Sequence, residues 1–166
     1  MPELPEVETT IRALQKIKNK KIIKIVINTK KLRFSIPKHI KFINNIKISN
    51  IRRIAKYIII DLDNFYSIVI HLGMSGRLKT VPSTYKRIKH DHFVLYFISN
   101  RILVYHDPRK FGFIDIVQTK GLQTEKYILS LGVDALSPDL TPQMIFKKIS
   151  KSAVPIKQIL LNQKLI

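Results

Sequence analysis

The sequence predicts an α+β fold in which an N-terminal helix packs on an antiparallel β-sandwich and short helices follow at the C-terminal end. The first residues show helical spacing, and a long middle region holds short runs rich in Ile, Val, Tyr and Phe. After Gly121 the spacing becomes helical again. Many short strands without long helices between them are typical of an antiparallel sandwich or barrel. We therefore expect one domain over residues 1–120 and a helical segment over residues 121–166.

The first predicted helix begins close to the N-terminus. Apolar residues recur there at steps of three and four, as on one face of a helix: Leu4, Val7, Ile11 and Leu14. Pro5 lies in the first turn, where acidic residues gather, and lysines follow in the last turn, at positions 16, 18 and 20. Such a helix would hold the N-terminal residues on a rigid element.

The middle region predicts strands from runs of β-branched and aromatic residues. These runs cover residues 22–28, 46–54, 57–62, 66–71, 93–98, 102–105 and 113–117. Asp63-Asn64 and Ser99-Asn100 have the composition of tight turns between neighbouring strands.

The C-terminal region predicts two short helices. Thr141-Pro142 has the composition of an N-cap followed by a first helical residue, and Pro155 opens a second helix. The chain then ends in an uncapped apolar tail, so we expect the sequence to be cut short rather than finished at this point.

The charge composition favours a polyanionic partner. Lys and Arg total 30 against 11 Asp and Glu, a formal net charge of +19, and nucleic acid is the leading candidate partner. Part of this excess is also explained by a composition biased toward lysine and isoleucine. The absence of cysteine excludes disulfides and thiolate zinc sites within this sequence. The sequence has neither a secretory signal nor an apolar run of about 18 residues, so we expect no membrane contact and a cytoplasmic location.

Pro2 and Glu3 combine a potential nucleophile with a potential proton donor. If Met1 is removed, Pro2 carries a secondary α-amine, and α-amino groups titrate near ~8, low enough to be partly neutral at physiological pH. A secondary amine forms a permanently charged iminium with a sugar aldehyde. Alternatively, the prolines stiffen the terminus and the acids complement the helix dipole.

Residues without an obvious packing purpose occupy the segments between strands. Lys56 lies in the segment Arg52–Tyr57, and Met74 lies between two glycines in His71–Arg77. Arg109 and Phe111 alternate in the segment Asp107–Phe113. Together they are typical of a nucleic-acid surface with inserted apolar side chains. Alternatively, Lys56 is a solvated edge residue, and Met74 and Phe111 belong to the core.

The histidines do not have the spacing of a metal site. His90 and His92 flank an aspartate at a strand entrance, so we expect no metal there. Because His90 follows several basic residues, a phosphate contact is the better prediction for it.

Five motifs, in order and spacing, resemble the bacterial formamidopyrimidine-DNA glycosylases. They are Met1–Glu8, Arg53–Tyr57, His71–Gly76, Lys89–His92 and Asp107–Gly112. The resemblance implies a base-excision repair enzyme, a DNA glycosylase with AP lyase activity, that removes oxidised purines such as 8-oxoguanine and formamidopyrimidines and then nicks the strand by β- and δ-elimination. Residues 1–120 would form its catalytic domain, and residues 121–166 a linker and the truncated start of its helical DNA-binding domain.

The same resemblance implies roles for individual residues. Pro2 would form a Schiff base with sugar C1′, Glu3 would protonate the opening ring, and Lys56 would donate a proton in β-elimination near the flanking phosphate. The side chains expected to fill or wedge the duplex, or to contact the DNA backbone or lesion, are Met74, Arg109, Phe111, His71, His90, Lys157 and, on a looser alignment, Lys151.

The sequence also departs from the family pattern. Lys110 stands where a second arginine is usual. Members continue through a helix-two-turn-helix and a four-cysteine zinc finger, and neither is found here, so we expect no cofactor in this chain. We expect a monomer on damaged double-stranded DNA in the nucleoid, a separate C-terminal polypeptide as a further partner, and reduced activity of this chain alone. The alternative is a non-catalytic, basic nucleic-acid-binding remnant.

Overall fold

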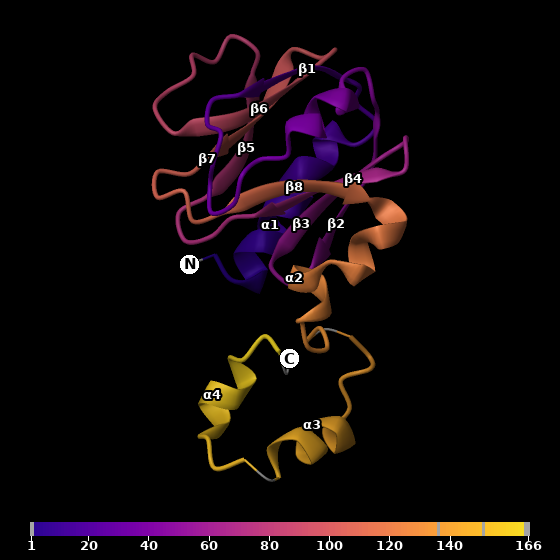
Figure 1. Cartoon of the computed structure of the whole chain (residues 1–166), viewed down its shortest axis with the longest axis vertical. Helices are drawn as coiled ribbons and strands as arrows, with labels where there is room; N and C mark the ends of the chain where they lie inside the picture. Colours follow the sequence, from indigo (N-terminus) through magenta and orange to yellow (C-terminus); the bar gives the residue numbers. More distant parts are fainter. Residues whose placement is uncertain (1, 136, 151, 165–166) are drawn as a thin grey trace. The chain divides into compact units, whose positions relative to one another are not determined.

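The computed structural model describes residues 2–135, 137–150 and 152–164 (Figure 1). The chain divides into two compact units, residues 1–120 and residues 121–166. The first unit contains an N-terminal helix and two four-stranded antiparallel sheets. The second contains short helices. The predicted α+β class, with a helix on an antiparallel sandwich and short helices after it, is confirmed.

Helix α1 spans Leu4–Leu14 and continues as a 3₁₀ turn, η1, over Gln15–Ile17. Its buried face consists of Val7, Ile11 and Leu14, as the spacing predicted. The helix is shorter than the lysine pattern suggested, because the chain leaves the helical conformation after the 3₁₀ turn and Asn19 adopts a positive φ of 66°.

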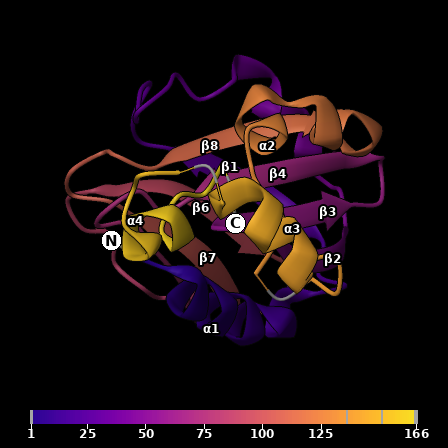
Figure 2. The same ribbon diagram turned by 90° about the horizontal axis from the view of Figure 1, so that it is seen from below.

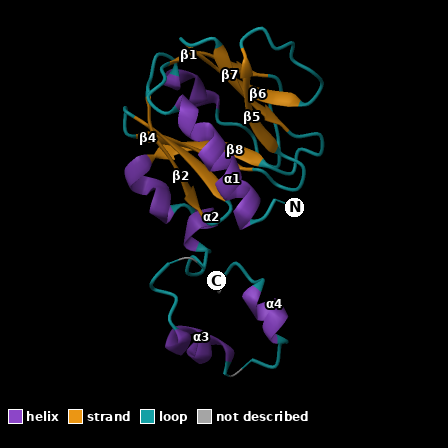
Figure 3. Cartoon of the chain, turned by 180° about the vertical axis from the view of Figure 1, so that it is seen from behind, coloured by secondary structure: helices purple, strands orange, loops and turns teal. Residues whose placement is uncertain are grey.

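The strands form two sheets (Figure 3). The first has the order β1 (Ile22–Ile27), β6 (Asp91–Phe97), β7 (Arg101–His106), β5 (Arg77–Pro82). The second has the order β2 (Ile48–Ile54), β3 (Tyr57–Leu62), β4 (Tyr66–His71), β8 (Phe113–Gln118). Hairpins join β3 to β4 and β6 to β7 at the two predicted turns.

Strand β5 was not predicted from the sequence. Its apolar residues face opposite sides: Leu78 packs on the core between the sheets, whereas Val81 packs on an outer cluster built on Val94, Ile102 and Val104. Strand β5 therefore lacks the regular alternation that identifies a half-buried strand. It also lies at the edge of its sheet and ends at Pro82, both common for edge strands.

Helix α1 closes one side of the sandwich. It contacts β2, an edge strand of one sheet, and β5, an edge strand of the other. Figure 2 shows α1 lying along this side of the sheets. Isoleucines dominate the core between the sheets, and α1 adds its buried face to the same core. The N-terminal residues are therefore anchored beside β5 and the hairpin between β2 and β3.

The remaining helices are short. A 3₁₀ helix, η2, spans Lys38–Ile43 in the first unit, and another, η3, spans Thr119–Thr124. In the second unit lie α2 (Lys126–Leu129), α3 (Pro142–Ile149) and α4 (Ile156–Leu160). Thr141 caps α3 as predicted, and Pro155 directly precedes α4. No helix in the described ranges is long and apolar enough to cross a bilayer.

Candidate active site at the N-terminus

Glu3 and Lys56 form an ion pair beside Pro2. Lys56 lies in the two-residue turn between β2 and β3, where Ala55 adopts a positive φ of 46°. The Lys56 ammonium contacts Glu3 Oε2, and its side chain is 14% exposed, so Lys56 is not the solvated edge lysine of the alternative interpretation. Two residues predicted for catalysis are thus in direct contact, and the third, Pro2, directly precedes Glu3 in the chain.

Arg53 connects the hairpin between β2 and β3 to α1. Its Nε lies 3.3 Å from Glu8 Oε2, and its Nη1 donates to the carbonyl oxygen of Ala55 at 3.0 Å. At the start of α1, Glu6 Oε2 accepts a hydrogen bond from the Glu3 backbone N–H at 2.9 Å. These contacts fix the position of Glu3 relative to Lys56.

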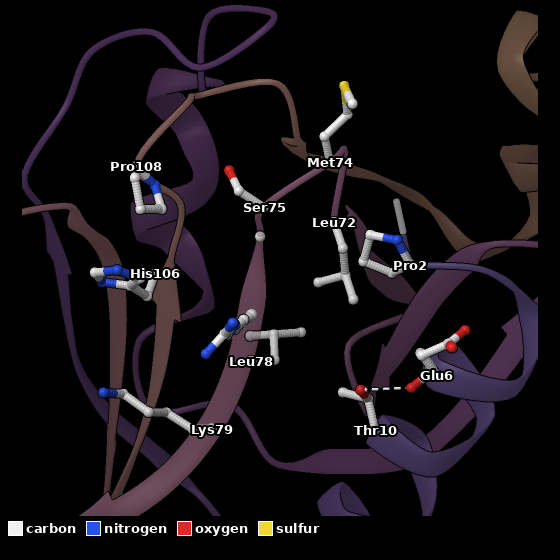
Figure 4. A pocket seen from close by; sticks show the side chains of 12 residues that line it. Pro2, Glu6, Thr10, Leu72, Met74, Ser75, Leu78, Lys79, His106 and Pro108 are labelled. Atoms are coloured by element: carbon white, nitrogen blue, oxygen red, sulfur yellow. Dashed lines mark hydrogen bonds between the residues drawn. The ribbon is translucent and has the colours of Figure 1, made fainter.

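Pro2 lines a pocket of about 810 Å³ (Figure 4). The pocket wall comes from the N-terminus and α1, from the segment 72–76, from β5 and from the end of β7. Its lining residues are Pro2, Glu6, Thr10, Leu72, Met74, Ser75, Gly76, Arg77, Leu78, Lys79, His106 and Pro108. Pro2 lies near Leu72 and Met74 in this view, so the predicted nucleophile adjoins a space large enough for a nucleotide.

Asp107 joins the two loops that border the pocket, which we call the 72–76 loop and the 107–112 loop. Its carboxylate is fully buried and accepts hydrogen bonds from Ser75 Oγ (2.6 Å), Tyr105 OH (3.1 Å) and the Gly112 N–H (2.9 Å). Burial, followed by the charge of Asp107, raises the pKa of Tyr105, which keeps its hydroxyl protonated as a donor. The two loops are therefore held in a fixed mutual position.

The close approach of these loops requires glycine. Gly73 adopts a positive φ of 63°, and a Cβ atom there would lie 2.4 Å from the Gly112 backbone nitrogen. A Cβ on Gly112 would lie 1.9 Å from Tyr105 OH and 2.4 Å from the backbone carbonyl oxygen of His71. Backbone contact at this distance cannot be relieved by moving a side chain, so both positions exclude larger residues.

Met74, Arg109 and Phe111 project from the two loops. Met74 is 44% exposed and Phe111 is 46% exposed, so neither belongs to the core. The Arg109 guanidinium lies 4.6 Å from the centre of the Phe111 ring, a cation–π contact. The structure therefore brings the three residues predicted to fill or wedge a duplex to exposed positions on neighbouring loops.

His71 lies at the end of β4, between the hairpin and the two loops. Its ring packs against Tyr57 and Phe113, and its Nδ1 accepts a hydrogen bond from the Gly73 N–H at 3.1 Å. Burial, and then the charges of Arg33 and Lys56, lower the pKa of His71, so the imidazole favours its neutral form.

His90 is half-buried just before β6, with a positive φ of 74°. Its ring centre lies 5.9 Å from that of His92 and 6.1 Å from that of His106. In the part of the chain that the structure describes, no group of three or more His, Asp and Glu side chains could hold a metal ion.

The two predicted lysines of the C-terminal region belong to the second unit. Lys157 is exposed on α4. Lys151 lies outside the described residues.

Sequence reasoning missed several residues that build the site. Arg53 and Asp107 were recognised only as members of motifs, although one anchors the Lys56 turn and the other joins the loops. The sequence offered one signal for these two residues, namely a charged residue in a motif that also contains buried neighbours. Asp91 was likewise recognised only as a member of the Lys89–His92 motif, and Lys79 had no signal of its own. Their partners, His106 and Tyr85, come from other parts of the chain.

Comparison with known proteins points to one family. The family described as formamidopyrimidine-DNA glycosylase N-terminal domain matches residues 1–114. The chain is 43% identical, over 169 residues, to a formamidopyrimidine-DNA glycosylase of Zymomonas mobilis, covering 100% of this chain and 62% of that protein.

Solved structures of a Lactococcus lactis formamidopyrimidine-DNA glycosylase are similar to the fold. One, bound non-covalently to DNA containing an AP site, gives a TM-score of 0.89 at 31% identity and covers 98% of this chain and 63% of that chain. Another, with DNA containing N7-benzyl-Fapy-dG, gives 0.89 at 32% identity and covers 99% and 61%. The chain thus spans about three fifths of the length of the proteins it matches.

Proposed function

Because the chain belongs to the formamidopyrimidine-DNA glycosylase family, we propose that it carries the catalytic chemistry of a DNA glycosylase and AP lyase. Its substrate would be double-stranded DNA with oxidised purines, such as 8-oxoguanine and formamidopyrimidines. The observation that carries the proposal is the arrangement of Pro2 on the pocket wall beside the Glu3–Lys56 ion pair. The AP-site and Fapy-dG DNA bound by the Lactococcus lactis protein support this substrate class.

The first step is attack by the Pro2 nitrogen on sugar C1′, once removal of Met1 has made it a secondary amine. The bond from C1′ to the base breaks, and the base leaves as an anion that water protonates. The Pro2 nitrogen gives its proton to the Glu3 carboxylate, and Glu3 donates this proton to the ring oxygen as the sugar opens. The product is an iminium between Pro2 and C1′ that carries a positive charge. The Lys56 ammonium beside Glu3 would neutralise the Glu3 carboxylate after it has given up its proton.

Strand cleavage follows because the iminium makes the protons on C2′ acidic. Loss of a C2′ proton breaks the bond between C3′ and its phosphate oxygen, and a second elimination releases the 5′ phosphate. Lys56 would donate a proton during the first elimination. Imine formation and proton transfer need neither a metal ion nor a redox cofactor, so we propose that these residues act without one.

Access to C1′ requires that the nucleotide leaves the duplex. Extrusion costs a few kcal/mol, which inserted side chains and phosphate contacts offset. Met74 and Arg109 would occupy the vacated space and Phe111 would wedge the opposite strand, consistent with their exposure on loops held together by Asp107. His71, His90, Lys151 and Lys157 would contact the backbone or the lesion.

Borohydride trapping tests the proposal. Duplex DNA with an abasic site is incubated with the chain, the iminium is reduced, and the adduct is measured on a denaturing gel and located by mass spectrometry. We expect an adduct on Pro2 that is strongly reduced in Pro2→Gly, because a primary amine, whose imine is charged only when protonated, replaces the secondary amine. Pro5→Gly is the matched control. An adduct unchanged in Pro2→Gly would contradict the role of Pro2, whereas salt-dependent DNA binding without any adduct would identify a non-catalytic DNA-binding protein.

A further inference from the structure

A cluster of three cationic or titratable side chains lies at the pocket edge formed by β5 and β7. We call Arg77, Lys79 and His106 the β5–β7 cluster. Arg77 is paired directly opposite His106 in the sheet, and Lys79 follows Arg77 on the same face of β5. In Figure 4, Lys79 and His106 lie on the side of β5 away from Leu78, Thr10 and Glu6. The proposed imine chemistry does not use any of the three.

A buried carboxylate orients His106. Asp91, 1% exposed, accepts a hydrogen bond from His106 Nδ1 at 2.9 Å and others from the Ile88 N–H (3.0 Å) and Tyr85 OH (3.1 Å). Burial opposes ionisation of Asp91, but the hydrogen bonds from Ile88, His106 and Tyr85 outweigh it and lower the Asp91 pKa. Since an ionised carboxylate only accepts hydrogen bonds, Nδ1 of His106 must carry the proton.

This arrangement leaves Nε2, the other ring nitrogen, for a ligand, and in the protonated imidazolium Nε2 carries a proton that it can donate to an anion. The His106 side chain is 21% exposed, and within the described residues its Nε2 has no hydrogen-bond partner. Lys79 reaches the same network, because its ammonium donates to Tyr85 OH at 2.9 Å. Arg77, opposite His106, is exposed.

The chemistry of the cluster selects an anion. A guanidinium, an ammonium and an oriented imidazole share one pocket edge, and the buried Asp91 holds His106 from behind. The cluster also continues toward His90, whose ring centre lies 6.1 Å from that of His106, and toward the exposed residues Lys86, Arg87 and Lys89. Guanidinium and ammonium groups are the common protein ligands of phosphate oxygens.

We propose that the β5–β7 cluster is a phosphate-binding subsite, with His106 as a phosphate ligand positioned by Asp91. The proposal rests on the proposed function in taking a strand phosphate of DNA as the source of the ligand; a free phosphate offers the same chemistry. It assigns a role in DNA contact to residues outside the imine-forming site. Binding of undamaged DNA, which needs no attack by Pro2, can therefore test it separately.

The experiment measures binding of the full chain to a short undamaged duplex over a series of salt concentrations. Each neutralised phosphate contributes about 0.9 to the slope of log K against log salt. We expect the slope to be smaller in magnitude by about 1 in the variant Arg77→Gln/Lys79→Gln/His106→Gln. This is the value for one phosphate that the three side chains contact together. Lys79→Gln should weaken binding by about threefold, in the range of a surface charge contact. Lys24→Gln is the matched control, because Lys24 is exposed on β1 at the opposite edge of the same sheet.

A second measurement follows the imidazole of His106 by ¹⁵N NMR during titration with inorganic phosphate and with the duplex. Shifts with both, together with the slope loss, support a strand phosphate. Shifts with inorganic phosphate and a wild-type slope in the triple variant support a phosphate site whose ligand is free phosphate. A wild-type slope with no shift, or equal effects of Lys24→Gln and Lys79→Gln, overturns the proposal. Failure of borohydride trapping alone would contradict the Pro2 chemistry and leave these results unchanged.

Discussion

Asp107 is a buried residue whose hydrogen bonds determine where exposed side chains lie. Its carboxylate has no solvent exposure and accepts from Ser75, Tyr105 and Gly112. Because Ser75 follows Met74, and Gly112 follows Phe111, the carboxylate fixes both exposed side chains relative to the pocket. Removing this carboxylate should therefore loosen the two loops as well as lower the free energy of unfolding.

Replacing Asp107 with Ala should therefore lower the free energy of unfolding by about 1–3 kcal/mol, because the buried donors whose hydrogen bonds it accepted lose their acceptor. Urea unfolding measures this change. Asp139→Ala, at an exposed carboxylate, is the control and should be neutral. Amide exchange at Gly112 should also become faster in Asp107→Ala, since its N–H loses its acceptor. Unchanged exchange at Gly112 would contradict the positioning role.

Helix α3 depends on a single side-chain cap at its start. Thr141 Oγ1 accepts a hydrogen bond from the Met144 backbone N–H at 3.2 Å, and Pro142 occupies the first turn. Thr141→Ala should destabilise the helix by about 1 kcal/mol, which corresponds to about fivefold faster exchange of the Met144 amide. Hydrogen exchange followed by NMR measures this rate. Thr141→Ser keeps the acceptor and should restore the slow exchange; equal rates in both variants would show that the cap has no effect.

The elements that the sequence predicts are those with a regular apolar pattern. The spacing in α1 and the Thr-Pro start of α3 were sufficient, because local rules determine both. Strand β5 was missed because Leu78 and Val81 pack on different clusters on opposite faces of the sheet. The sequence of an edge strand that contributes to two clusters therefore shows no regular hydrophobic alternation.

Contacts between elements could not be predicted from the sequence either, because they depend on how the elements pack in space. Motifs identify Glu3 and Lys56 one by one, but the ion pair between them depends on how α1 packs across β2 and β5. The hydrogen bond between Asp91 and His106 likewise depends on the register of β6 and β7. Neither packing nor register follows from local spacing.

At the scale of the whole first unit, the buried His92 and the half-buried His71 make its stability depend on pH. Burial lowers the pKa of His71, and the charges of Arg33 and Lys56 lower it further. Burial also lowers the pKa of His92, against the hydrogen bond to the Asp107 carbonyl. Both imidazoles are therefore more easily protonated in the unfolded chain, where histidine titrates near ~6.5.

The sign of the effect follows from proton counting. Below about pH 6.5 the unfolded state binds more protons than the folded state, so the free energy of unfolding falls as the pH decreases toward the lowered folded-state pKa. Asp91 acts at lower pH, because its folded-state pKa is also lowered and its stabilisation is lost only below the usual range of an aspartate. The decrease between about pH 7 and 5 should therefore come from the histidines.

Urea unfolding at a series of pH values tests this assignment with His71→Gln. The variant removes one titrating group, so its free energy of unfolding should fall less steeply than that of the wild type as the pH decreases. The difference in slope should not exceed about 1.4 kcal/mol per pH unit, the limit for one proton. His39→Gln, at an exposed histidine on η2, is the control and should keep the wild-type slope. Parallel curves for His71→Gln and the wild type would show that His71 protonates equally in the folded and unfolded chain.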